Sequence, residues 1–157
     1  MTKTKRTVVI GIDGSKYSDD AFKWFKKHYA QPATDEIILF HSICPSASVS
    51  APILKGLPTN PDKDYAIQLK KLQLEADVLE AKFMDRCEKS GLKCTWKTSL
   101  GSPNLNLVHA VEENKAQMVV MGTRGLNLFR RTLVGSVSTY VTQHVNVPVL
   151  VVPSLSQ

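Results

Sequence analysis

The segment between residues 121 and 138 carries the residue types that bind phosphate groups. It combines glycines, hydroxyl side chains and arginines, at Gly122, Arg124, Gly125, Arg130, Arg131, Gly135, Ser136 and Ser138. Glycine lets a backbone approach a ligand closely. If Gly135 and Ser136 open a helix, the free N–H groups of its first turn and the helix dipole favour an anion. The segment therefore predicts a phosphate cradle, with glycines that merely mark turns and caps as the alternative.

A carboxylate, Asp13, stands directly after the apolar run at residues 7–12 and before Gly14 and Ser15. Such a group can orient a ribose hydroxyl, an adenine edge or a bound Mg²⁺. The alternative is a turn or cap role, at which aspartate excels. The chain has no Gly-x4-Gly-Lys-Ser/Thr motif and no Gly-x-Gly-x-x-Gly after the first apolar run. Classical kinases, GTPases and dehydrogenases therefore lose support.

The elements that must position these groups alternate along the chain. Apolar or alternating runs predict strands at residues 7–12, 36–43, 93–99, 118–121 and 147–152. Helical periodicity and capping residues predict helices at 19–29 (with Ser18 as N-cap), 64–90, 103–114 and 136–144. Parallel strands need crossover connections, so the pattern predicts an open, doubly wound α/β sheet of five parallel strands with helices on both faces. Ligands of such sheets bind at the carboxyl ends of the strands, where the strand order reverses.

Composition narrows the class of protein. The 157 residues predict one domain, residues 1–157, with a core at about 6–153. No apolar run reaches the ~20 residues of a membrane span, so we expect a soluble, cytoplasmic protein. Three cysteines without Cys-x-x-Cys spacing predict reduced thiols. The proline-rich stretch from Cys44 to Pro61 has no periodic pattern, and we expect it to be mobile and to contact the ligand.

The motif Gly122-x2-Gly125-x9-Gly135-Ser136 resembles the nucleotide-binding motif of the universal stress protein family. Three further segments resemble that family in order and spacing: residues 9–15 its first strand and aspartate, 119–125 its fourth strand, and 135–153 its closing helix and strand. The resemblance spans about residues 6 to 153 and implies the Rossmann-like fold of the adenine nucleotide alpha hydrolases. Gln117 departs from the family, whose members often have aspartate there, and we expect a local effect only.

The intact glycine motif resembles the ATP-binding branch of this family. The resemblance implies ATP as ligand, with ADP or AMP as alternatives and Mg²⁺ as an optional companion. By position, Ile12, Asp13 and Ser42 would face the adenosine, Met121 and Gly122 would lie under adenine and ribose, Arg124 would add charge, and Gly125, Gly135, Ser136, Val137 and Ser138 would hold the phosphates. The family also implies a homodimer joined through residues 147–153, an apolar run on an edge strand.

Three functions remain in competition. The first is a nucleotide-binding regulatory or stress-response protein. The second is an enzyme, in the form of a slow ATP hydrolase; the ligand loops contain no histidine, glutamate or second carboxylate, so no catalytic residue is assigned. The third is nucleic-acid binding, suggested by the net charge of +6. The lysine clusters lie on different elements, which makes this third reading the weakest.

Overall fold

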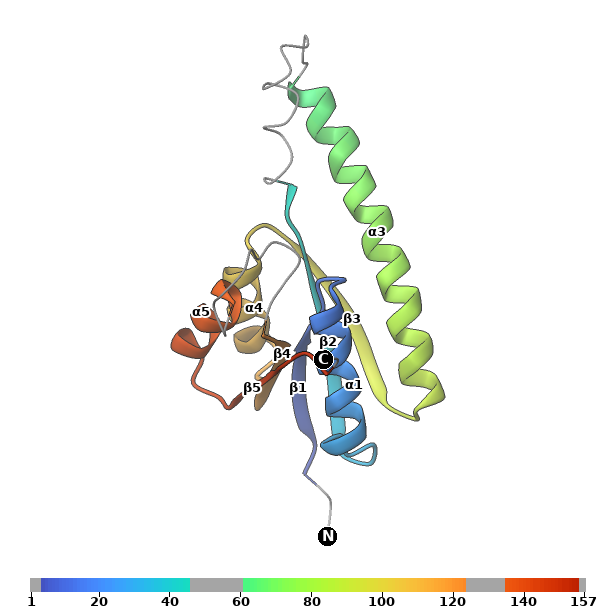
Figure 1. Ribbon diagram of the computed structural model, residues 1–157, viewed down its shortest axis with the longest axis vertical. Coiled ribbons are helices and arrows are strands. Elements are labelled where there is room, and N and C mark those ends of the chain that lie inside the picture. Colours follow the sequence, from blue (N-terminus) through green and yellow to red (C-terminus); the bar gives the residue numbers. More distant parts are fainter. Residues whose placement is uncertain (1–3, 46–60, 124–134, 156–157) are drawn as a thin grey trace.

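The computed structural model describes residues 4–45, 61–123 and 135–155, and this part of the chain forms a parallel sheet flanked by helices (Figure 1). In chain order the elements are β1 (Arg6–Gly11), α1 (Lys16–His28), β2 (Asp35–Ile43), α3 (Pro61–Lys89), β3 (Lys93–Leu100), α4 (Pro103–Glu113), β4 (Met118–Gly122), α5 (Ser136–His144) and β5 (Val149–Val152). The sheet has five strands in the order β3-β2-β1-β4-β5, all parallel. The predicted doubly wound α/β fold is confirmed, and its strand order reverses between β1 and β4.

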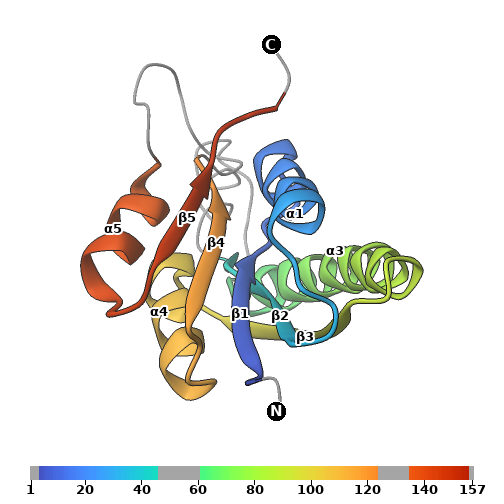
Figure 2. The ribbon, with the colours of Figure 1, turned by 90° about the horizontal axis from the view of Figure 1, so that it is seen from below.

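Two hydrophobic cores cover the two faces of the sheet. Alternate residues of each strand point to opposite faces, so Val8 and Ile10 pack beneath α1 and α3, whereas Val9 lies beneath α4 and α5. Figure 2 shows the same division, with α1 and α3 on one side of the sheet and α4 and α5 on the other. Strands buried on both faces must be apolar at every position, and this explains the continuous apolar runs of β1 and β4.

The first helix begins earlier than the sequence predicted. Ser15, not Ser18, is the N-cap of α1, and its Oγ accepts a hydrogen bond from the Ser18 backbone N–H at 3.2 Å. The Ser18 hydroxyl in turn donates to the carbonyl of Ser15 at 3.0 Å. Both residues are cap-forming types, and the sequence alone did not decide between them. The earlier start brings the first turn of α1 to the end of β1.

The prediction of reduced thiols was wrong for two of the three cysteines. Cys87 and Cys94 form a disulfide between the last turn of α3 and the start of β3, with Cα atoms 6.2 Å apart. Gly91, at a φ of +66°, ends the helix and reverses the chain between them. The spacing of seven residues matches no disulfide motif, and only the tight helix-to-strand turn brings the two side chains together.

A cluster of charged side chains holds α1 against α3. Asp19 of α1 contacts Arg86 of α3 at 2.6 Å, Lys23 at 2.6 Å and Lys82 at 3.3 Å. Burial alone would raise the pKa of Asp19, but the hydrogen bond from Lys23 and the charges of Arg86 and Lys82 lower it to about 2. The Arg86 guanidinium also lies over the ring of Phe22, 4.6 Å from its centroid. Polar and apolar contacts together fix the angle of α3 to the sheet.

Candidate functional site

The reversal of strand order puts the carboxyl ends of β1 and β4 side by side, with β2 next to β1. The turn after β1, the end of β2 and the segment after β4 therefore meet at one edge of the sheet. Most of the predicted site residues in the described part lie there, and three others belong to the first turn of α5. Arg124 and Gly125 fall outside the described residues, as does most of the stretch from Cys44 to Pro61.

The turn after β1 is built by hydrogen bonds of Asp13. Its Oδ1 accepts from the Ser15 backbone N–H at 2.9 Å, and its own N–H donates to the Ser18 hydroxyl at 3.3 Å. Gly14 has a φ of +80°, a conformation that favours glycine. Asp13 therefore has the turn role that the sequence left as its alternative. The second carboxylate oxygen, Oδ2, is the atom that it can offer to a ligand.

The end of β2 presents two polar side chains to opposite faces of the sheet. Ser42 faces α4, where its Oγ accepts a hydrogen bond from the Asn106 side chain at 3.3 Å. His41 faces α3, where Nδ1 lies 2.7 Å from the carbonyl oxygen of Ile12. Because a carbonyl oxygen only accepts hydrogen bonds, Nδ1 carries the proton. His41 also stacks on Trp96 of β3, with ring centroids 6.0 Å apart.

The segment after β4 packs directly against the first turn of α1. A Cβ on Gly122 would lie only 2.7 Å from both the carbonyl carbon and the oxygen of Tyr17. This position therefore requires glycine for packing, independently of any ligand. The next residue, Thr123, donates its N–H to Val152 of β5 at 3.0 Å and accepts at its carbonyl from the N–H of Gly135 at 2.6 Å. These contacts bring α5 to the end of β4.

The first turn of α5 presents backbone N–H groups rather than side chains. Gly135 is the N-cap, and no side chain of the described residues caps this helix. The predicted Ser138 hydroxyl points inward and donates to the Gly135 carbonyl at 2.9 Å, so its proton is engaged. Val137 packs against the core beneath α4 and α5, and Ser136 is exposed. The described atoms that suit an anion are therefore the N–H groups of this turn and the Ser136 hydroxyl.

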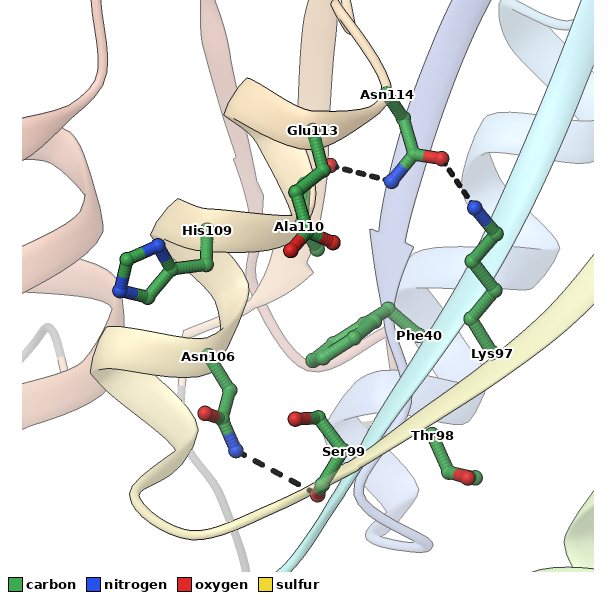
Figure 3. Close-up of a pocket in the computed structure, with 9 residues that line it drawn as sticks. All are labelled: Phe40, Lys97, Thr98, Ser99, Asn106, His109, Ala110, Glu113 and Asn114. Atoms are coloured by element: carbon green, nitrogen blue, oxygen red, sulfur yellow. Dashed lines mark hydrogen bonds between the residues drawn. The ribbon is translucent and has the colours of Figure 1, made fainter.

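A shallow groove lies beside this edge, on the α4 face of β2 and β3 (Figure 3). It measures about 330 Å³ and is lined by Phe40, Lys97, Thr98, Ser99, Asn106, His109, Ala110, Glu113 and Asn114. Asn106 connects the groove to the predicted site through its bond to Ser42. His109 and Glu113 are exposed at the rim. The groove is thus a flank of the predicted site and does not replace it.

Sequence reasoning missed three residues that shape the site. His41, Tyr17 and Asn106 each join two of its segments by the contacts described above. A signal existed for His41, because it ends the continuous apolar run of β2 at residues 37–40, just before the strand itself ends. Tyr17 and Asn106 lie on helices and gave no comparable signal.

Within the described residues, no group of three or more His, Cys, Asp or Glu side chains is placed to hold a metal ion. In the same part of the chain, none of the helices combines the length and apolarity of a membrane span.

Comparison with known protein families gives a match over nearly the whole chain. The model of the universal stress protein family matches residues 5–153. Universal stress protein MJ0531 of Methanocaldococcus jannaschii is 30% identical over 147 residues, which cover 94% of this chain and 81% of that protein. A universal stress protein from Synechocystis is 32% identical over 84 residues, which cover 54% of this chain. One from Mycolicibacterium smegmatis is 29% identical over 152 residues, which cover 95% of this chain. The matched parts span about half the length of those two relatives, 54% and 48%.

Solved structures share the fold at lower identity. Hypothetical protein MJ0577 superposes with a TM-score of 0.81 and 22% identity, covering 99% of this chain and all of its own. A universal stress protein family protein from Arabidopsis thaliana with AMP bound superposes with a TM-score of 0.68 and 16% identity. The match covers 96% of this chain and 93% of that chain. A universal stress protein in complex with cAMP superposes with a TM-score of 0.68 and 23% identity. The match covers 97% of this chain and 99% of that chain.

Proposed function

Because the chain belongs to the universal stress protein family, we propose that it binds adenine nucleotides, ATP foremost, at the carboxyl ends of β1, β2 and β4. In this proposal the protein is a regulatory or stress-response nucleotide binder. The protein would signal through whether its nucleotide site is occupied or empty, and it would act in the cytoplasm.

The proposal is supported by a series of contacts that links the turn after β1 to the start of α5. Asp13 holds the backbone N–H of Ser15, the N-cap of α1. Tyr17 in the first turn of α1 packs on Gly122, and Thr123 bonds to Gly135 at the start of α5. A carboxylate suited to hydroxyl or amine groups is thereby joined to a helix N-terminus suited to anions. A nucleotide offers both kinds of group at its two ends. The AMP and cAMP complexes of structural neighbours support the adenine class.

The phosphates would lie against the N–H groups that open α5, with Gly125 and Arg124 completing the cradle. Adenosine would lie toward Ile12, Asp13, Ser42, Met121 and Gly122. A Mg²⁺ ion, if it accompanies ATP, would be bound by the phosphates themselves. Such an arrangement binds ATP without positioning a base for hydrolysis, so we expect turnover that is slow at most.

Calorimetric titration of the full chain with ATP, ADP, AMP, cAMP and GTP tests this proposal. We expect saturable binding of the adenine nucleotides and weak or no binding of GTP. Equal affinity for GTP would contradict recognition of the adenine ring. No heat with any nucleotide up to millimolar concentration, from folded protein, would overturn the proposal. Phosphate release measured on the same samples, with and without Mg²⁺, separates a binder from a hydrolase.

We also propose a homodimer joined through β5 and the residues around it, 147–153. β5 is an edge strand, and Val149, Leu150 and Val151 are only partly buried in the single chain. An edge strand with partly exposed apolar side chains favours pairing with a second chain. Light scattering at tens of micromolar protein should give twice the monomer mass. A monomer under these conditions, with and without ATP, would contradict the dimer.

A further inference from the structure

The outer face of α3 carries an apolar stripe that is largely exposed in the described part of the chain. Ile67, Leu74 and Val78 follow one another at steps of seven and four residues, so they lie in line along the helix. Their side chains are 63%, 58% and 69% exposed. The buried residues of α3, among them Ala76 and Phe83, lie on the opposite face.

The first half of α3 also has little support from the sheet. Between Asp62 and Glu75 no residue is buried, although Tyr65, Leu69 and Leu72 continue the inward-facing stripe. In Figure 1 these first turns lie well beyond α1, α4 and α5. Isolated helices shorter than ~12–15 residues are marginal in water, and helices in proteins owe most of their stability to packing of an apolar face. The helix and its stripe are therefore suited to a packing partner.

The charges beside the stripe favour one kind of partner. Lys70 and Asp77 lie on the same flank of the stripe, two turns apart. In an antiparallel pair of identical helices, equivalent flanks face each other, so each Lys70 would face the Asp77 of the other copy. In a parallel pair about a two-fold axis, this flank would face the opposite flank of the other helix, so Lys70 and Asp77 of the two copies would not meet. The flank is thus complementary to itself when one copy is inverted, as an isologous interface requires.

We propose that α3 pairs antiparallel with α3 of a second copy of this chain, about a two-fold axis near Leu74. Ile67 of each copy would pack near Val78 of the other, and the two Leu74 side chains would lie near the axis. Three apolar side chains per copy make a small interface, so the association is weak by itself. The proposal does not rest on nucleotide binding or on pairing through β5.

This surface lies far from the proposed β5 interface in the sheet order. α3 packs on β3 and β2, whereas β5 is the opposite edge strand. Both interfaces can therefore form at once, and two different two-fold contacts on one chain produce assemblies larger than a dimer. Effective concentration within such an assembly would strengthen the weak α3 contact.

Site-directed cross-linking tests the pairing in the full chain. In a Cys44→Ser background, Leu74→Cys places a thiol near the proposed axis, and a short bismaleimide should join two chains. Gln73→Cys is the control, because residue 73 is exposed at the same height of α3 and lies outside the stripe. This variant also removes the hydrogen bond that the Gln73 amide donates to Asp77 at 3.1 Å, which leaves the Asp77 carboxylate available to the other copy. We expect at least about fivefold more cross-linked dimer from Leu74→Cys, with the Cys44→Ser parent as blank. Equal yields from the two variants would overturn the proposal.

Charge reversal tests the partner and its orientation. Lys70→Glu or Asp77→Lys alone should reduce the Leu74→Cys cross-link several-fold, and the double variant should restore it. These residues are exposed, so circular dichroism should be unchanged. Failure of the double variant to restore the cross-link would exclude the antiparallel pair. A thiol at position 74 that reacts slowly with a monofunctional maleimide in monomeric protein would show that something other than a second copy covers the stripe, and this too would overturn the proposal.

Discussion

The Nδ1 atom of His41 lies 2.7 Å from the carbonyl oxygen of Ile12 and ties the end of β2 to the turn after β1. The same imidazole stacks on Trp96 of the edge strand β3. Asp13 follows Ile12 directly, so the position of its carboxylate depends on this hydrogen bond. A histidine outside any catalytic motif thereby becomes a positioning residue for the proposed nucleotide site.

Replacement of His41 by leucine should weaken adenine-nucleotide binding without unfolding the protein. The lost hydrogen bond is worth about 0.5–1.5 kcal/mol, which corresponds to roughly a two- to tenfold loss of affinity. His41→Asn is the matched control, because the Asn side-chain amide can still donate near the Nδ1 position. Calorimetry on both variants should give an affinity for His41→Asn closer to the parent. Equal losses in the two variants would mean that the ring, and not the donor, matters.

Glycine at position 122 should be required for stability even without a ligand. In Gly122→Ala the new Cβ would lie 2.7 Å from backbone atoms of Tyr17, which cannot move aside as a flexible side chain can. Overpacking of this kind costs typically ~1–3 kcal/mol. Urea unfolding of the ligand-free protein measures the loss. Gly11→Ala is the control, since its Cβ would make an ordinary contact with Leu107 at 3.4 Å, and a comparable loss there would refute the steric explanation.

The position of this glycine also shows what the sequence could and could not predict. The doubly wound parallel sheet with helices on both faces follows from hydrophobic patterns and the crossover rule, and it was predicted correctly. The strand order, with its reversal between β1 and β4, came from the structure. Gly122 was assigned to the ligand, because the pattern of glycines pointed to a phosphate loop. Its contact with Tyr17 joins residues more than a hundred positions apart, and no local pattern encodes such a contact.

The start of α1 and the disulfide were mispredicted for different physical reasons. Ser15 and Ser18 are equally good N-caps in isolation, and the packing of α1 on β4 and β5 decides where the helix begins. Cys87 and Cys94 become neighbours only because Gly91 reverses the chain tightly between α3 and β3. The sequence shows which residues can cap a helix or form a disulfide. It does not predict the geometry of a turn between two packed elements, which decides whether they do.

Acid should weaken the contact between α1 and α3 as the pH falls below about 3.8. The pKa of Asp19 is lowered from 3.8 to about 2 in the folded state, so its contribution is fully present above pH 3.8 and is lost as the pH falls toward 2. The contribution is ~1–2 kcal/mol after allowance for solvent screening. Unfolding free energies measured between pH 5 and 2 should fall less steeply in Asp19→Asn than in the parent. Identical slopes would exclude the carboxylate as the titrating group.

The two ends of the proposed ligand can be separated by two substitutions. Gly135 has a φ of −74°, which any residue adopts, so a side chain there would not strain the backbone. What remains is occupancy: a valine side chain at the N-cap of α5 would occupy the approach to the N–H groups of the first turn. Gly135→Val should therefore lower the affinity for ATP more than about tenfold and the affinity for adenosine less than about threefold, since adenosine has no phosphate to displace. Urea unfolding confirms that the variant remains folded.

Asp13 acts at the other end of the ligand, and its turn role complicates the obvious substitution. Asp13→Ala removes the acceptor of the Ser15 N–H as well as the charge, so it should lower stability by ~1 kcal/mol and weaken ATP and adenosine by similar factors. Asp13→Asn keeps a side-chain oxygen at the position of Oδ1, and therefore the turn, while it replaces Oδ2 by a donor. If Asp13 binds adenosine through Oδ2, Asp13→Asn should retain the parent's stability and still lose affinity for both ligands. Parental affinity in Asp13→Asn, measured by the same titrations, would reduce Asp13 to a turn residue and leave adenosine recognition to the backbone of Ile12 and Gly122.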